Sequence, residues 1–201
     1  MFNPFIPADS ARSRDRLTGA LNRQYFFELL GEEKCCADRN GKAFLLCLID
    51  IDQLRNINEQ AGQTAGDDVL LGLANKLRDA LDTRPWSNLN YLHARFDGGG
   101  LMLLLRCPDI EEGRRFAHAL RARVAESQLG RQYDLTVSIG VSRYRLGESI
   151  DELVARTERT LFLAKQSGRD CVEVATQTSG EPERDNVVYL HEAPARWRDV
   201  V

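Results

Sequence analysis

The sequence lacks several features that would indicate a function class directly. Its 27 basic and 30 acidic residues give a net charge of −3, without the basic excess that is typical of proteins that bind nucleic acid. No segment approaches the roughly 18 consecutive apolar residues of a membrane span, and the N-terminus has no apolar signal-peptide core. We therefore expect a cytoplasmic protein with neither a nucleic-acid partner nor a membrane partner.

Cysteine and histidine are too few and too scattered to predict a metal centre. The five cysteines are odd in number and have no metal-site spacing, and the three histidines do not form a cluster. Cys47 and Cys171 lie in apolar runs, which predicts small residues of the core. Free cysteines of this kind suit a reducing cytosol.

The length of 201 residues is sufficient for one packed domain with flanking segments. Residues 1–14 contain Pro4 and Pro7 followed by a charged run, and we expect an irregular N-terminal arm there. The domain itself is expected over residues 15–175. A polar tail follows over residues 176–201, and its short apolar segment 187–190 is a candidate for docking.

Apolar periodicity predicts the elements of the domain. Helical spacing indicates helices over residues 21–36, 68–81 and 110–127, and another from residue 149 to Gly168. Apolar or alternating runs indicate strands over residues 43–49, 91–96, 101–105, 133–141 and 171–174. The three glycines between the second and third strands predict a β-hairpin turn, and residues 83–90 are expected to form a loop.

This order of elements predicts an α+β fold. We expect a ferredoxin-like β-α-β-β-α-β core, which the palm of nucleotide-polymerising enzymes shares, with helices packed on one face of a central, mostly antiparallel, five-stranded sheet. Such a fold does not determine a function, so the motifs must carry that argument.

Two carboxylates, Asp50 and Asp52, lie at the end of the first predicted strand. Asp50 is a candidate ligand for Mg²⁺, which proteins hold through one or two carboxylates together with substrate phosphates. The alternative is that both residues are N-cap and turn residues of the next element.

Two further pairs are candidate nucleotide contacts. The Asn58 amide and the Asp67 carboxylate carry the donors and acceptors needed to read the edge of guanine, whereas Asp67 could instead cap the following helix. Lys165 and Arg169 lie at a predicted helix end, where they could reach phosphates or simply complement the helix dipole.

Several segments, in order and at matching spacing, resemble the motifs of one family. Residues 15–23 are similar to D-x-L-T-G-L-x-N-R, and residues 50–58 to D-x-D-x-F-K-x-I-N. Residues 62–67 match G-H-x-x-G-D except that Gln63 replaces His, and residues 137–141 and 161–169 match V-S-I-G-V and L-Y-x-A-K-x-x-G-R. Over roughly residues 15–174 the chain resembles the GGDEF domain of bacterial diguanylate cyclases, which condense two GTP molecules into cyclic di-GMP.

The signature that names the family, R-(Y/F)-G-G-(D/E)-E-F, is degenerate in this chain. Alignment on Arg95 and on the following apolar strand fills the last five positions with Asp97, Gly98, Gly99, Gly100 and Leu101. Gly99 then occupies the position of the acidic residue that binds the metals in the family, and Gly100 occupies the position of the Glu that follows it. Asp97 precedes the turn, and a shift of one residue along a strand turns a side chain to the opposite face of the sheet. We therefore do not expect Asp97 to take the place of the missing acidic residue.

The resemblance implies two metal ions held between several carboxylates. In this chain Asp50 remains as a metal ligand, and Asp52 is a second candidate. A single weakly held Mg²⁺ with GTP is the most that these residues suggest. Loss of one catalytic electrostatic group costs about 10²–10³ in rate, so we expect negligible cyclase activity.

We therefore expect an inactive GGDEF-like domain that acts as a signalling or interaction module in cyclic di-GMP-related regulation through a protein partner. Such a module can retain GTP binding without catalysis. The resemblance assigns nucleotide contacts to Asn58, Asp67, Arg55, Lys165 and Arg169. Its inhibitory motif, R-x-x-D, would fall at Asn88 and Tyr91, so we expect no cyclic di-GMP at that site. The alternative is an active cyclase that uses Asp97 in an unusual register.

Overall fold

The computed structural model describes residues 12–175, so the apolar segment 187–190 and most of the expected N-terminal arm lie outside the described residues. The helices of this part are α1 (Arg23–Asn40), α2 (Leu54–Ala61), α3 (Gln63–Asp82), the 3₁₀ turn η1 (Trp86–Asn88), α4 (Ile110–Ala125), α5 (Gln128–Tyr133) and α6 (Ile150–Gln166). Its strands are β1 (Leu45–Ile51), β2 (Tyr91–Arg95), β3 (Gly100–Leu105), β4 (Val137–Arg143) and β5 (Val172–Val174).

The strands form one five-stranded sheet in the order β2-β3-β1-β4-β5. Strand β1 lies at the centre and pairs antiparallel with both β3 and β4, whereas β4 and β5 are parallel. The α+β class and the mostly antiparallel sheet are therefore confirmed. The first four strands in this order are those of the ferredoxin-like core, and β5 extends the sheet beyond β4.

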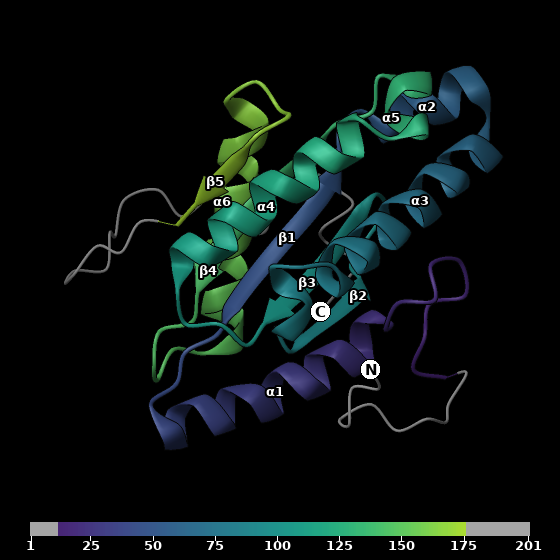
Figure 1. Cartoon of the computed structure of the whole chain (residues 1–201). Coiled ribbons are helices and arrows are strands. Elements are labelled where there is room, and N and C mark those ends of the chain that lie inside the picture. Colours follow the sequence, from purple (N-terminus) through teal and green to yellow (C-terminus); the bar gives the residue numbers. More distant parts are fainter. Residues whose placement is uncertain (1–11, 176–201) are drawn as a thin grey trace.

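Helices cover both faces of the sheet, so the expectation of helices on one face was wrong (Figure 1). One cluster of buried residues packs α3 and α4 against the sheet, and a second cluster packs α1 and α6 against the opposite face. The central strand serves both clusters because its side chains alternate: Leu45 and Cys47 belong to the first, and Leu46 and Leu48 to the second. A strand buried on both faces reads as a continuous apolar run, which hides the presence of a second helical layer.

Two short helices were not predicted. Helix α2 begins three residues after β1 ends. Helix α5 ends at Tyr133, the first residue of the predicted strand, so β4 begins at Val137 rather than at residue 133. Helix α3 begins at Gln63 instead of residue 68, because Gly62 (φ +88°) ends α2 and starts α3 without an intervening loop. The first turn of α3 is polar, so its sequence carries no apolar periodicity.

The β2–β3 hairpin is confirmed. Arg95 pairs with Leu101, and the turn between them is closed by a hydrogen bond of 2.6 Å from the Gly100 amide to the Asp97 carbonyl. On its outer side, β2 exchanges backbone hydrogen bonds with Leu21, from the Leu21 amide to the His93 carbonyl (3.1 Å) and from the Arg95 amide to the Leu21 carbonyl (2.9 Å). The segment before α1 thus covers part of the edge of the sheet.

Helix α6 begins as the sequence predicts. Ser149 and Glu152 form a capping box, in which the Glu152 amide donates to the Ser149 hydroxyl (3.2 Å) and the Ser149 amide donates to the Glu152 carboxylate (2.7 Å). The helix then crosses β4 at Gly140 with almost no space between the backbones. A Cβ at Gly140 would lie 2.4 Å from the Leu161 amide nitrogen and 2.8 Å from the Thr157 carbonyl oxygen.

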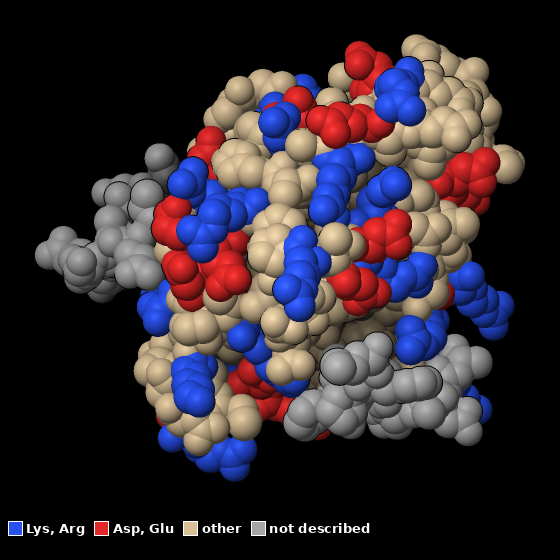
Figure 2. Space-filling model, viewed as in Figure 1, with Lys and Arg blue, Asp and Glu red and all other residues tan. Residues whose placement is uncertain are grey.

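The surface charge is mixed. Figure 2 shows basic and acidic side chains interspersed over the viewed face, where α4 lies in front. Three arginines of α4 form ion pairs: Arg114 with Glu111 (2.7 Å), Arg115 with Asp109 (3.8 Å) and Arg121 with Asp170 (2.7 Å). Within residues 12–175, no helix combines the length and the apolar character that crossing a bilayer would require.

The close crossing at Gly140 generates a stability test. We expect Gly140→Ala to lower the free energy of unfolding by about 1–3 kcal/mol, because the added methyl group meets the rigid backbone of α6. Urea unfolding followed by circular dichroism measures this change. Gly31→Ala in α1 is the matched control: its Cβ would lie 3.8 Å from Ile150, so we expect no loss of stability. Equal losses in the two variants would show that Gly140 is not a contact point.

Candidate functional site

The two charged residues that the sequence assigned to different ligands contact each other. Nζ of Lys165, in the last turn of α6, donates to Oδ2 of Asp50 on β1 at 2.5 Å. The side chains are 21% and 18% exposed, so the pair lies partly shielded at the end of the sheet. From the sequence we expected Asp50 to bind Mg²⁺ and Lys165 to bind phosphate. In the structure the carboxylate and the ammonium group neutralise each other.

Gly100 lies directly opposite Asp50 in the β1–β3 ladder. A Cβ at Gly100 would lie 3.6 Å from Oδ1 of Asp50, so a side chain at this position would extend beside the carboxylate. A Cβ at Gly99 would instead contact Leu54 (3.0 Å) and Ile51 (3.6 Å). The acidic side chains of the signature are thus missing beside Asp50 and at the start of α2.

The turn itself does not require glycine at both missing positions. Gly98 adopts the left-handed region (φ +42°), in which glycine is favoured, but the φ values of Gly99 and Gly100 lie outside that region. The backbone angles therefore admit other residues there, but a Cβ at Gly100 would lie 3.2 Å from the Asp97 carbonyl oxygen, which is a tight contact. The hairpin thus pairs in register, from Arg95 opposite Leu101 onward, without acidic side chains at positions 99 and 100.

Asp52 has a structural role. Its carboxylate accepts hydrogen bonds from the Thr136 hydroxyl (2.8 Å), the Ser138 hydroxyl (2.7 Å) and the Asp170 amide (3.0 Å), and the residue is 5% exposed. These bonds tie the end of β1 to the segment before β4 and to the turn after α6. Because the oxygens of the Asp52 carboxylate already accept hydrogen bonds, Asp52 can bind a metal beside Asp50 only if these hydrogen bonds break.

Asn58 and the residues beside Asp67 meet where α2 contacts α3 (Figure 1). The Asn58 amide packs on Gly66 so closely that a Cβ at Gly66 would lie 1.8 Å from Oδ1. This oxygen is buried and accepts no hydrogen bond from the described part of the chain. Asp67 lies within α3, whose N-cap is Gly62, so the alternative that Asp67 caps the helix was wrong.

The other two basic candidates are exposed. Arg55 lies on α2, is 90% exposed and forms an ion pair of 2.8 Å with Glu59 one turn later. Arg169 follows the end of α6 in a left-handed conformation (φ +66°), and its amide donates to the Ala164 carbonyl at 3.2 Å. Neither side chain joins the contact between Asp50 and Lys165, although both residues flank the end of the sheet at which this contact lies.

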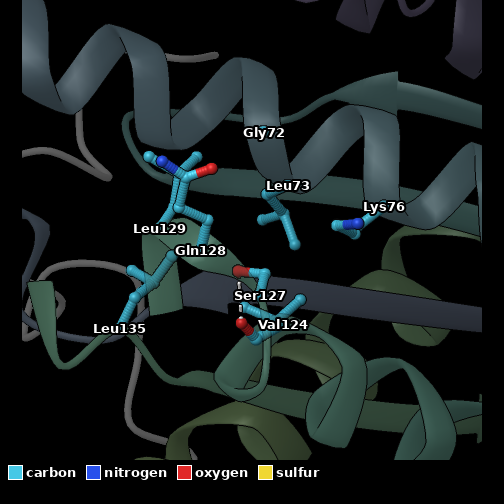
Figure 3. Close-up of a pocket in the computed structure, with 8 residues that line it drawn as sticks. All are labelled: Gly72, Leu73, Lys76, Val124, Ser127, Gln128, Leu129 and Leu135. Atoms are coloured by element: carbon cyan, nitrogen blue, oxygen red, sulfur yellow. Dashed lines mark hydrogen bonds between the residues drawn. The ribbon is translucent and has the colours of Figure 1, made fainter. Parts of the chain in front are cut away.

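A pocket of about 210 Å³ lies elsewhere, between α3 and the α4–α5 connection (Figure 3). Leu73 and Leu135 line it together with Lys76, and Leu129 fills the space left by the missing side chain of Gly72. The Ser127 hydroxyl donates to the Val124 carbonyl at 2.7 Å beside the opening. None of the candidate nucleotide residues lines this pocket.

The residues present do not fit the two Mg²⁺ ions that cyclase chemistry implies. Within residues 12–175, no group of three or more His, Cys, Asp or Glu residues is arranged to hold a metal ion. Asp50 is engaged by Lys165, Asp52 by three donors, and positions 99 and 100 have no side chains. A single ion at Asp50 would have to compete with the Lys165 ammonium.

The family comparison agrees with this arrangement of elements and motifs. The family model described as "Diguanylate cyclase, GGDEF domain" matches residues 12–171. The chain belongs to the GGDEF family. The resemblance inferred from the motifs is therefore confirmed.

Individual relatives support the same family assignment. The diguanylate cyclase DgcP of Pseudomonas aeruginosa is 34% identical over 164 residues, which are 80% of this chain but 24% of that protein. The chain thus spans about a quarter of the length of this relative. Among solved structures, the diguanylate cyclase SiaD of P. aeruginosa, in complex with its activator SiaC, superposes with a TM-score of 0.71 and 29% identity over 81% of this chain and 61% of that chain. The GGDEF domain of DgcB from Caulobacter crescentus, in complex with c-di-GMP, gives a TM-score of 0.74 at 23% identity over 86% and 98%, which supports the fold.

The sequence did not reveal the pairing of Lys165 with Asp50. The two residues are separated by 115 positions, and each had a plausible ligand by itself. One available signal was the loss of acidic residues at positions 99 and 100, because it removes the neighbours with which Asp50 would share a metal. A carboxylate that lies beside a helix end carrying a lysine is expected to pair with it.

Proposed function

We propose that this GGDEF domain makes no cyclic di-GMP and acts as a GTP-binding interaction module in cyclic di-GMP-related signalling. The absence of cyclase activity is supported by one observation. Asp50 faces Gly100 instead of an acidic residue, and its charge is neutralised by Lys165. Attack of a 3′-hydroxyl on an α-phosphate in the two-metal mechanism needs two ions, and the carboxylates that would hold the second are missing.

GTP binding is supported by residues that lie outside the degenerate turn. The buried Oδ1 atom of Asn58 has no hydrogen-bond donor among residues 12–175, which costs free energy unless a ligand or a reorientation of the amide supplies one. Guanine carries donors at N1 and N2, and the neighbouring Asp67 carboxylate accepts such donors. The backbone around this pair, including Gly66, leaves the Asn58 amide just enough space.

The interaction role is supported by exposed apolar side chains on the helix that carries Lys165. Phe162 is 53% exposed and Leu163 is 48% exposed, immediately before Ala164 and Lys165. Large exposed apolar side chains that adjoin one another are typical of contact surfaces. A protein partner that covers this face would lie close to the Asp50–Lys165 pair. The similar protein SiaD was solved in complex with its activator SiaC, which supports a protein partner for this domain.

The inactivity is tested by the product. We expect the unaltered chain, incubated with GTP and Mg²⁺, to form no cyclic di-GMP above the background without protein, as measured by chromatography with mass detection. An active cyclase in the same assay is the positive control. Loss of one essential electrostatic group already lowers the rate by about 10²–10³, and two acidic positions are missing here.

The matched variant is Gly99→Asp combined with Gly100→Glu. The φ values at both positions admit side chains, and circular dichroism checks that the tight contacts with Leu54 (3.0 Å) and the Asp97 carbonyl (3.2 Å) leave the fold unchanged. Product from this variant but not from the unaltered chain would assign the defect to these two positions. Product from the unaltered chain would refute the proposal and favour an active enzyme that uses Asp97.

Guanine recognition is tested with Asn58→Ala. We expect this variant to bind GTP roughly 3–10-fold more weakly and to lose part of its preference for GTP over ATP, because one hydrogen bond to the base is lost. Isothermal titration calorimetry with both nucleotides measures the two affinities. Asn56→Ala is the control, since Asn56 lies on the same helix and its amide bonds to Gln53 (2.8 Å). Equal effects of the two substitutions, or an unchanged ratio of GTP to ATP affinity, would contradict the assignment of Asn58.

A further inference from the structure

The contact between Lys165 and Asp50 has a consequence for any ligand with phosphate groups. Lys165 is the cation that the sequence motif directs toward phosphate, and in this structure its ammonium group is bonded to a carboxylate. The distance of 2.5 Å and the partial burial of both side chains describe a close, charge-assisted contact. A phosphate that binds Lys165 must therefore compete with Asp50.

In a site that uses Mg²⁺, the metal would separate these two groups, because it would draw the aspartate toward itself and leave the lysine for the phosphate. Here the other members of a metal site are absent or engaged. Gly100 offers no carboxylate opposite Asp50, and the oxygens of Asp52 are held by Thr136, Ser138 and the Asp170 amide. The positive charge beside Asp50 thus comes from the protein itself.

We propose that Lys165 replaces the metal in this site, so that the nucleotide triphosphate is bound without Mg²⁺ and Asp50 acts as an internal competitor for the lysine. This inference rests on the proposed function, since it presupposes that the site accepts GTP. Free GTP carries more negative charge than its Mg²⁺ complex and is the better ligand for a bare ammonium group. Asp50 then lowers the affinity for the phosphates, which is the opposite of the role expected for a metal ligand.

The first measurement uses the unaltered chain and needs no variant. GTP is titrated by calorimetry in EDTA and again in saturating Mg²⁺, and inorganic triphosphate is titrated in EDTA. We expect GTP to bind at least as tightly in EDTA as in Mg²⁺, and inorganic triphosphate to compete with it. Binding that appears only with Mg²⁺ would overturn this inference while leaving the proposed GTP binding intact.

The second measurement uses Asp50→Asn, which keeps the shape of the side chain and removes its charge. Release of Lys165 from a partly exposed ion pair is expected to tighten GTP binding in EDTA by up to about fivefold. Lys165→Met is expected to weaken the same binding. Asp97→Asn is the matched control, because it removes one negative charge from the adjacent turn without touching Lys165, and it should change the affinity much less. Circular dichroism confirms that each variant is folded.

The outcomes separate the two proposals. Weaker binding by Asp50→Asn, or equal tightening by Asp97→Asn, would refute the competition between Asp50 and phosphate. Absence of GTP binding in the unaltered chain and in every variant would remove the proposed GTP binding and this inference together. Binding by Asp50→Asn in EDTA, where the unaltered chain shows none, would support the inference in its strongest form.

Discussion

The ion pair between Lys165 and Asp50 is the interaction on which the chemistry of this domain depends. It joins the end of the central strand to the last turn of α6, and it forms because α6 lies directly on β4 at Gly140. A partly exposed pair of this kind contributes little to stability, about 0–1 kcal/mol. Its importance is chemical, because it determines which charges at the end of the sheet are available to a ligand.

The fold and the active-site chemistry are separable in this chain. Stability resides in two apolar clusters on the two faces of the sheet, neither of which includes Gly99 or Gly100. The β2–β3 turn keeps the register of its strands without any acidic side chain at its tip. The missing acidic side chains at positions 99 and 100 therefore do not affect the two apolar clusters, and the same scaffold presents the face of α2 and α3 and the exposed side chains of α6.

Much of the fold could be predicted from the sequence, because its signals are local. The hairpin follows from three glycines between apolar runs, and the start of α6 follows from Ser149 and Glu152 three residues later. Helices α2 and α5 were missed because they are short, with 8 and 6 residues, so each offers at most about two turns in which a helical period can be recognised. The second helical layer was missed because a strand buried on both faces gives no alternation from which to count layers.

The candidate site was predictable residue by residue but not as an arrangement. Asp50, Asn58 and Lys165 were identified from motif positions, yet their contacts depend on segments far apart in the chain. Asp52 is hydrogen-bonded to Thr136, Ser138 and Asp170, which follow it in the chain by 84, 86 and 118 positions. Lys165 lies 115 positions from Asp50. Such pairings follow from sheet order and helix placement, which no single motif encodes.

The central claim is that the charge of Asp50 is balanced by Lys165 and not by metal ions. Electron paramagnetic resonance of Mn²⁺, which takes the oxygen ligands of Mg²⁺, tests it directly when the protein is mixed with a GTP analogue that cannot react. We expect the spectrum of the Mn²⁺–nucleotide complex to be unchanged by the protein. A spin-coupled pair of Mn²⁺ ions that forms on the unaltered chain and disappears in Asp50→Asn would contradict the claim.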